Sequence, residues 1–261
     1  MPMKPDERIA MLARIGYLAR AIIYFALGYL SLATGRAEGT TSVLSPLSRI
    51  PGGEALTAAL AIGLTAYGLF RLYGAYVDLE ADGDDAKGIA KRAGHALSGF
   101  AHFGLAYGAA SLFAWGTQPD DGAAGRDATA YALGLPFGWA ILIVVGIGFS
   151  IAAFAQAEKA WSANFMRLLT RDAPHWSEVV GRIGYAARAA VFAAIAWAMV
   201  DLGRSGQADE VGFQDALAAY DGRGWLFAGV AGGLMLFGVF SLVMARYRDV
   251  CDTAWVRKLT A

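Results

Sequence analysis

Residues 14–20 read RIGYLAR, and residues 182–188 repeat that stretch as RIGYAAR. Residues 92–98 hold a third copy with more changes, RAGHALS. Each copy starts a long apolar segment, and a second apolar segment follows it. Self-similarity of this kind indicates one supersecondary unit that is used several times. We therefore expect a single domain, 1–261, which contains three repeats at residues 10–80, 88–162 and 178–250.

The second apolar segments of the first and third repeats are also alike. Residues 63–70 read GLTAYGLF and residues 233–240 read GLMLFGVF, whereas residues 148–153 of the middle repeat, GFSIAA, have diverged. Small residues let helices in a membrane approach closely, because lipid supplies no hydrophobic drive for their association. We therefore expect Gly16 and Gly184 of the repeated stretch to be close-packing positions.

The composition indicates a membrane protein. Hydrophobic residues make up 57% of the 261 and charged residues only 17%, whereas a soluble domain carries about a quarter charged residues. The charged residues leave six apolar runs, and a run of about 20 residues crosses a bilayer as a helix. The six predicted helices are at residues 14–34, 53–76, 92–115, 137–157, 182–202 and 224–246.

Two helices return the chain to the side where it started, so successive repeats have the same orientation. The predicted fold class is an all-α polytopic membrane protein, with six transmembrane helices as three parallel two-helix repeats and pseudo-threefold symmetry. Lys and Arg are also unevenly shared between the two sides. The termini, the linkers after the second and fourth helices and the adjoining helix ends carry 17, and the other three linkers carry five. Basic residues mark the cytoplasmic side, so both termini are predicted to be cytoplasmic.

Several function classes are disfavoured by what the chain lacks. The formal net charge is zero, so there is no basic field for nucleic acid. A single cysteine, Cys251, allows neither an internal disulfide nor a cysteine metal cluster. The motifs of phosphate-binding loops, serine hydrolases and zinc proteases are not found. We therefore expect no catalytic residues, no metal and no cofactor, and a protein that is not an enzyme.

The three Arg-x-Gly-Tyr-x-x-Arg-like copies, each followed by a glycine-rich second helix, resemble the bacterial integral-membrane family catalogued as domain of unknown function 1206. That family is built of tandem two-helix membrane repeats, and the likeness covers nearly the whole chain. The middle copy departs from the pattern, with His95 in place of the tyrosine and Ser98 in place of the second arginine. The resemblance implies six helices in a bacterial inner (plasma) membrane, and it carries no activity over.

Arg20 and Arg188 are the most informative polar residues, since each lies six residues into its helix, roughly 9 Å deep at 1.5 Å per residue. Ionisable residues inside membranes often mark a site or pathway. With Ser98 as the third member, they form a candidate site for an anion or a lipid headgroup. Two simpler roles stay open for the arginines. They could reach the headgroups with their long side chains, or they could pair with an acid such as Glu158 or Asp78.

His95 and His102 are two helical turns apart and share a face, so they are a candidate proton-linked pair. The alternative is that each is a buried histidine bonded to a neighbouring helix. Arg71, Gln156 and Glu158 close the cytoplasmic ends of second helices and could line a polar vestibule. The alternative here is ordinary polarity where a helix meets water.

Two linkers on the predicted cytoplasmic side are rich in charge. The acidic linker at residues 78–85 lacks the ligand spacing of a calcium loop, so we expect it to be solvated. Residues 161–169, with Lys159, Arg167 and Arg171 around them, are expected to form an amphipathic turn that meets anionic lipid.

These observations favour a structural or accessory inner-membrane protein that binds membrane lipids or a membrane-protein partner. The alternative is a channel or transporter for a small anionic solute along the pseudo-threefold axis. A redox or proton-linked protein that uses the two histidines is a third hypothesis. Substrate, partner and oligomeric state are not specified by the sequence.

Overall fold

A computed structural model describes residues 5–40, 42–117, 130–205, 218 and 224–250. All of its named elements are helices, and the described residues include a single isolated β-bridge, between Leu169 and Arg248. The elements in chain order are α1 (Pro5–Thr34), α2 (Leu44–Ser48), α3 (Gly53–Val77), α4 (Ala86–Trp115), α6 (Gly138–Ser162), the 3₁₀ helix η1 (Asn164–Leu168), α7 (Trp176–Ser205) and α9 (Gly224–Tyr247). The all-α prediction is therefore confirmed for the described part of the chain.

Five of these helices are long and apolar enough to cross a membrane, and they are α1 from Glu7 onward, α3, α6, α7 and α9. The sixth predicted span corresponds to α4, which does not meet that criterion within the described residues. Its first two turns carry Lys87, Lys91 and Arg92. Of the six predicted spans, five correspond to helices of this kind, and the sixth stays a prediction.

The ends of α4 follow known capping rules. The Asp85 carboxylate precedes the helix and accepts a hydrogen bond from the Gly88 N–H at 2.8 Å, which satisfies a backbone donor that has no partner within the helix. Gly116 ends the helix with φ at 65°, a left-handed conformation that glycine adopts without steric strain. These two residues define α4 as one continuous 30-residue helix.

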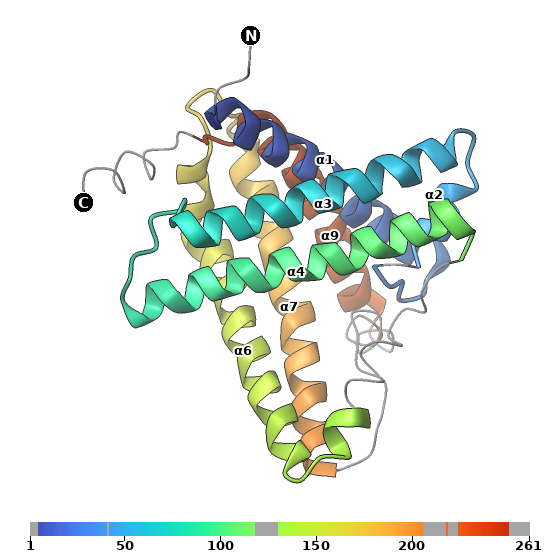
Figure 1. The fold of residues 1–261 in the computed structure, drawn as a ribbon, viewed down its shortest axis with the longest axis vertical. Coiled ribbons are helices and arrows are strands. Elements are labelled where there is room, and N and C mark those ends of the chain that lie inside the picture. The colour runs from blue at the N-terminus through green and yellow to red at the C-terminus, as the bar shows by residue number, and fades with distance from the viewer. Residues whose placement is uncertain (1–4, 41, 118–129, 206–217, 219–223, 251–261) are drawn as a thin grey trace.

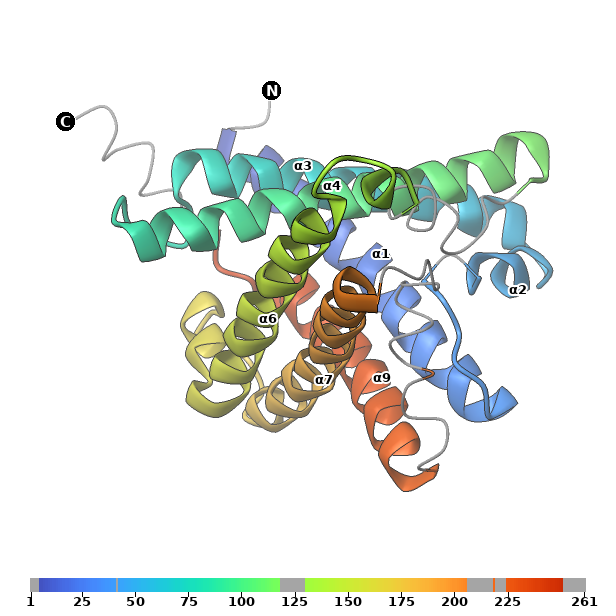
Figure 2. The same ribbon diagram turned by 90° about the horizontal axis from the view of Figure 1, so that it is seen from below.

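The long helices pack as three pairs, α1 with α9, α3 with α4 and α6 with α7. Figure 1 shows α3 and α4 running side by side across the molecule while α6 and α7 run along it. Figure 2, seen from below, places the α3–α4 pair along one side and α6, α7 and α9 on the other. Further contacts between α1 and α3 and between α7 and α9 join the pairs, whereas the described residues of α4 and α6 form no such packing.

The repeat glycines allow the joining contacts. A Cβ atom on Gly16 would lie 2.6 Å from the Tyr67 Cα, and one on Gly184 would lie 2.8 Å from the Phe237 Cα. In the other direction, a Cβ on Gly63 or Gly233 would meet the Cβ atom of an alanine on the first helix, at 2.5 and 2.6 Å. Helices this close exclude any side chain at the contact, so the predicted close packing at Gly16 and Gly184 is confirmed.

Candidate functional site

Glu80 is the centre of a buried ionic cluster at the end of α3. Asp78 ends that helix in a left-handed conformation, with φ at 55°, and its carboxylate accepts hydrogen bonds from the backbone N–H groups of Asp82 and Gly83. This turn directs the chain back over the helix ends. There the Glu80 carboxylate meets Arg71 Nη1 at 3.2 Å and Arg248 Nη2 at 3.0 Å.

His95 connects α4 to the same cluster. Its Nε2 lies 3.0 Å from an Asp82 carboxylate oxygen and 3.6 Å from Glu80, and its Nδ1 contacts the Arg71 guanidinium. Lys91 also pairs with Asp82, at 3.2 Å. The cluster therefore ties together α3, the start of α4 and the chain after α9.

The charges in this cluster compensate one another. Burial opposes ionisation of Glu80, but the Arg248 and Arg71 guanidinium groups outweigh it and hold the pKa of that carboxyl well below its usual range. Burial also opposes ionisation of Asp82, and hydrogen bonds from His95 and Lys91 nevertheless lower its pKa. Both carboxylates are charged at neutral pH. The prediction of a solvated linker at residues 78–85 is therefore wrong for these two side chains, which are 11% and 4% exposed.

Glu80, Asp82 and His95 place three atoms of metal-ligand type within 4.8 Å of one another. Two guanidinium groups already neutralise Glu80, and one of them also contacts His95, so a metal ion would face cations at close range. The adjoining cavity is about 10 Å³, which is room for about one water molecule. The chemistry of the cluster is therefore that of ion pairs that hold helices together.

Arg20 lies deeper, inside the helix assembly, and is 5% exposed. Its Nε donates to Ser241 Oγ at 3.1 Å and its Nη1 to Tyr67 Oη at 2.5 Å. Its Cζ is 4.6 Å from the ring centroid of Tyr17, 5.0 Å from that of Tyr67 and 4.8 Å from that of Phe237. Aromatic faces stabilise a desolvated cation. The partners of Arg20 are thus hydroxyl groups and rings rather than Glu158 or Asp78.

Arg188 approaches the same Phe237 ring, at 4.7 Å from its centroid, and it also lies over Tyr24 and Phe192. The structure therefore brings Arg20 and Arg188 to one aromatic side chain. Ser98 is not joined to them, because no hydrogen bond within the described ranges connects its hydroxyl to either guanidinium. Its carbonyl oxygen instead accepts a hydrogen bond from His102 Nδ1 at 2.7 Å.

The two histidines, His95 and His102, have different surroundings and do not form a pair. His95 belongs to the ionic cluster, whereas His102 packs against Tyr67 with ring centroids 4.4 Å apart. Its Nε2 is buried, and no hydrogen-bond partner for it occurs in the described part of the chain. The vestibule residues are separated as well. Arg71 is in the ionic cluster, Gln156 is partly buried and Glu158 is exposed, and among the described residues they share no hydrogen bond or ion pair.

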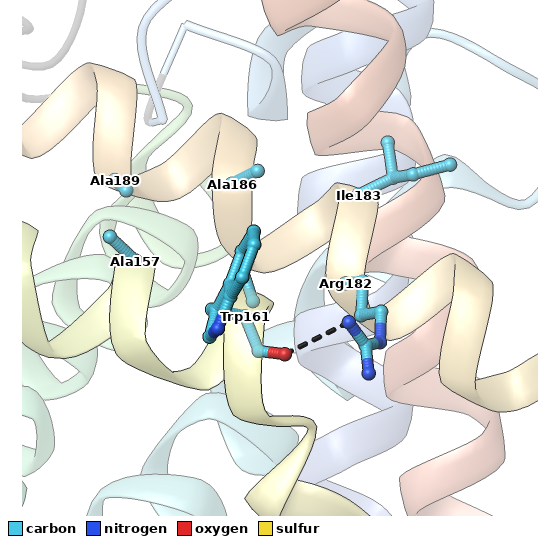
Figure 3. Close-up of a pocket in the computed structure, with 7 residues that line it drawn as sticks. Ala157, Trp161, Arg182, Ile183, Ala186 and Ala189 are labelled. Carbon is cyan, nitrogen blue, oxygen red and sulfur yellow. Dashed lines mark hydrogen bonds between the residues drawn. The ribbon is translucent and has the colours of Figure 1, made fainter.

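A lateral groove lies between α6 and α7. Its volume is about 470 Å³, and it is lined by Ala157, Ala160, Trp161, Arg182, Ile183, Ala186 and Ala189. Figure 3 shows the Trp161 ring between the alanines and Arg182. Arg182 Nη1 donates to the Trp161 carbonyl at 2.9 Å, and its Nε donates to Glu178 at 3.0 Å. The groove is therefore apolar along its length and carries a cation at one end.

The comparisons with known proteins identify the repeats. The family model of the domain of unknown function DUF1206 matches residues 15–78, 93–163 and 183–248, which together are more than half of the chain. The chain belongs to the DUF1206 family. The uncharacterised protein YxxB of Bacillus subtilis (strain 168) is 30% identical over 255 residues, which cover 93% of this chain and 92% of that protein. No solved structure matches the chain significantly.

Membership of DUF1206 confirms the resemblance expected from the repeated motif, and with the five apolar helices it indicates a multi-pass membrane protein. The buried Arg20 and Arg248 and the partly buried Arg71 and Arg188 lie within the DUF1206 segments. Glu80 and Arg182 lie just outside them.

Sequence reasoning missed Glu80 and Arg248 as partners, because 168 positions separate them. One usable signal was the acidic linker directly after a helix whose last two turns include Arg71. The repeated motif marks Arg182 only as its first residue, and the proximity of that residue to Trp161 depends on how α6 and α7 pack.

Proposed function

We propose that this chain is a structural or accessory protein of the bacterial inner membrane that binds an anionic phospholipid in the groove between α6 and α7. The observation that carries the proposal is the groove, an apolar hollow of about 470 Å³ with Trp161 and Arg182 at one end. The role requires binding only, with no catalytic step.

The walls of the groove suit an acyl chain. Ala157, Ala186 and Ala189 have small side chains that leave the hollow between two membrane helices (Figure 3). Lipid tails surround such helices in a bilayer, and an inserted tail gains dispersion contacts that a flat helix surface does not offer. Trp161 is 85% exposed, as is typical of tryptophans at the level of the headgroups.

The charged end suits a phosphate group. The Arg182 side chain is 42% exposed, so a headgroup can reach it. Its contacts with Glu178 and the Trp161 carbonyl use three of its N–H groups. A guanidinium has five such donors, and its planar fork matches the geometry of phosphate oxygens. Two donors therefore remain for an anionic headgroup.

Arg167 in the 3₁₀ helix η1 and Arg171 just after it follow this end of the groove in the chain. Lys159 instead places its ammonium over the Tyr185 ring, 5.7 Å from the centroid. Each basic residue near an anionic leaflet contributes about 1 kcal/mol to its attraction. The same bias in basic residues supports placing this end of the molecule, and both termini, on the cytoplasmic side.

We further propose that α4 is the sixth span and that the three repeats surround a pseudo-threefold axis. The cyclic order of the three helix pairs, α1 with α9, α3 with α4 and α6 with α7, supports this arrangement. The joining contact between α4 and α6 is the one that the described residues do not form, so the three repeats surround the axis as an open ring.

Native mass spectrometry of the protein in nanodiscs of mixed phosphatidylglycerol and phosphatidylcholine tests the lipid site. We expect wild-type protein to retain phosphatidylglycerol preferentially and Arg182→Gln to weaken that retention about tenfold, the equivalent of one charge-assisted contact. Glu178→Gln breaks the same ion pair but keeps the cation, so it should retain the lipid. Arg204→Gln, at the other end of α7, is the matched control. Equal retention by wild type and Arg182→Gln would contradict the proposal.

A channel or transporter for a small anionic solute is the second candidate. It is favoured by Arg20, whose Nη2 is buried and has no hydrogen-bond partner among the described residues. The side chains of Leu64, Leu234 and Phe237 are 0% exposed, so a solute path would have to displace packed residues. Anion flux in proteoliposomes that disappears in Arg20→Ala and Arg188→Ala would support this candidate, and no flux from wild-type protein would count against it.

A further inference from the structure

The middle repeat exposes the face of its first helix that the flanking repeats bury. Ile23 of α1 and Val191 of α7 occupy the same repeat position, nine residues after the first arginine of the motif. They are 1% and 0% exposed, because they lie where each first helix packs on its second helix. Ala101 occupies that position in α4 and is exposed. The corresponding face of α4 therefore has no helix of the described chain against it.

The second helix of the middle repeat shows the same difference. Leu60 of α3 and Val230 of α9 lie three residues before the packing glycine and are 1% and 5% exposed. Val145 takes that position in α6 and is 39% exposed. We call these two faces the seam. It is defined by the exposed Gly94, Leu97 and Ala101 on α4, and by the exposed Val145 and Gly148 and the partly buried Ala152 on α6.

The seam keeps the glycines of a helix contact. Gly94 and Gly148 correspond to the glycines through which α1 packs on α3 and α7 packs on α9. A Cβ atom on either residue would meet nothing within 4 Å. The middle repeat thus carries the small residues of a close helix contact, and no helix of the described chain occupies it.

The two faces of the seam are also complementary in size. In the flanking repeats the large side chain at the contact is on the second helix, as Tyr67 or Phe237, and the first helix has an alanine opposite a glycine. In the middle repeat the large side chain is on the first helix, as Leu97, and Ala152 stands in place of the aromatic residue. The large side chain is therefore on α4 rather than on the second helix. Leu97 protrudes from α4, and the small residues Gly148 and Ala152 on α6 leave room for such a side chain.

We propose that a second copy of this chain covers the seam, with α4 of each copy packed on α6 of the other. Such a pairing is a closed twofold dimer in which the same surface serves both partners. Gly94 and Gly148 favour a helix rather than an acyl chain as the occupant of the seam, because glycine allows another helix backbone to approach closely. Each copy has one exposed first-helix face, on α4, and one exposed second-helix face, on α6. In a dimer, each of these faces packs on the complementary face of the other copy. This inference uses surfaces separate from the lipid groove and does not depend on it.

Cysteine cross-linking in native membranes tests the pairing, in a Cys251→Ser background. One tagged copy carries Leu97→Cys and a second, differently tagged copy carries Ala152→Cys. We expect a disulfide-linked heterodimer when the two are co-expressed. A control pair of Leu97→Cys with Ile62→Cys, at an α3 position that is 68% exposed, should not cross-link.

The double variant Leu97→Cys/Ala152→Cys distinguishes the other occupants. A disulfide found only within one chain would mean that the seam closes on itself, and it would overturn the proposal. Absence of any cross-link, with lipid-bound monomers in native mass spectrometry, would overturn it in favour of lipid.

A second set of variants uses the open glycines. Gly94→Leu places a side chain where the monomer has space, so the fold should survive while cross-linked dimer decreases about tenfold, as for the loss of one close helix contact. Gly229→Leu, at an equally open position on α9, is the matched control and should leave the dimer intact. An unchanged dimer yield in Gly94→Leu would contradict the proposal.

Discussion

The flanking repeats and the middle repeat begin with the same motif and are held in place differently. In the flanking repeats, glycine brings the first helix against the backbone of its own second helix, at Tyr67 and Phe237. In the middle repeat the equivalent Gly94 meets nothing, and α4 is held at its start by ion pairs to Asp82 and Glu80. The difference shows that the motif alone does not decide how its helix packs, because the residues opposite it differ between the repeats.

The residue at the tyrosine position of the motif also differs in its surroundings between the flanking repeats and the middle repeat. Tyr17 and Tyr185 lie among aromatic rings, whereas His95 of the middle repeat faces carboxylates. A histidine there gains a partner only because the 78–85 linker folds back over it. The middle repeat therefore depends on a linker for an attachment that the flanking repeats obtain from helix packing.

Removing Glu80 should break this ionic attachment and give the largest effect. Glu80→Ala leaves Arg71 and Arg248 buried without their carboxylate, and loss of one partner of a buried pair costs about 3–5 kcal/mol. The free energy of unfolding in mixed micelles measures the loss. Asp84→Ala is the control, because its carboxylate is 93% exposed and its pair with Arg92 should contribute less than about 1 kcal/mol. Equal effects of the two substitutions would contradict a structural role of the cluster.

Replacing the motif glycine by alanine should lower the free energy of unfolding in the flanking repeats but not in the middle repeat. Gly16→Ala and Gly184→Ala force Cβ atoms against backbone, and we expect each to lower the free energy of unfolding by about 1–3 kcal/mol. Gly94→Ala meets open space and improves helix propensity, so it should be neutral or stabilising by up to about 1 kcal/mol. Similar losses at all three positions, measured in the same micelles, would show that the middle repeat is packed like the others.

Acid should weaken the middle repeat through Glu80. Its pKa in the folded protein is held below its ordinary value of 4.5, so its contribution to stability is complete above that value and is lost as the pH falls through the folded pKa. The contribution of Glu80 to thermal stability in detergent should therefore be level from neutral pH to about pH 5 and decline in stronger acid. In Glu80→Gln the decline below about pH 5 should be shallower than in wild type, with part of the remainder due to Asp82. A decline of unchanged steepness would exclude Glu80 as its source.

The smallest effect is expected at the groove. Arg182 and Glu178 form an i,i+4 pair whose side chains are 42% and 45% exposed, and such pairs contribute about 0.3–0.5 kcal/mol. Arg182→Gln should thus lower lipid retention while the free energy of unfolding changes by less than about 0.5 kcal/mol. A larger loss of stability would indicate that Arg182 holds α7 in place rather than binding lipid.

Much of the fold could be predicted from the sequence, because helix length, apolar content and glycine spacing are local properties. Arg20 could be singled out as a buried residue of interest for the same reason, since it lies inside an apolar helix. Its partners could not be identified, because Ser241 is 221 positions away. The burial of Glu80 was missed because an acidic linker ordinarily faces water, and only Arg71 and Arg248 together reverse that preference.

The open middle repeat could not be predicted for a related reason. Gly94 and Gly148 keep the glycine pattern, so the sequence alone favours three equal repeats. The exchange of a small residue for Leu97 and of an aromatic residue for Ala152 changes which faces fit within one chain. That effect depends on pairs of positions about fifty residues apart in sequence.

Unequal packing of the repeats is tested most directly by the distance between helices within the middle repeat. Spin labels at Tyr107 and Val144 mark α4 and α6, and labels at Tyr29 and Ala59 mark the equivalent positions of α1 and α3, all of them exposed. Pulsed dipolar spectroscopy in lipid, with an excess of unlabelled copies to suppress distances between molecules, compares the two pairs. We predict a clearly longer distance for the Tyr107–Val144 pair. Equal distances in the two pairs would contradict unequal packing, because all three repeats would then be packed alike.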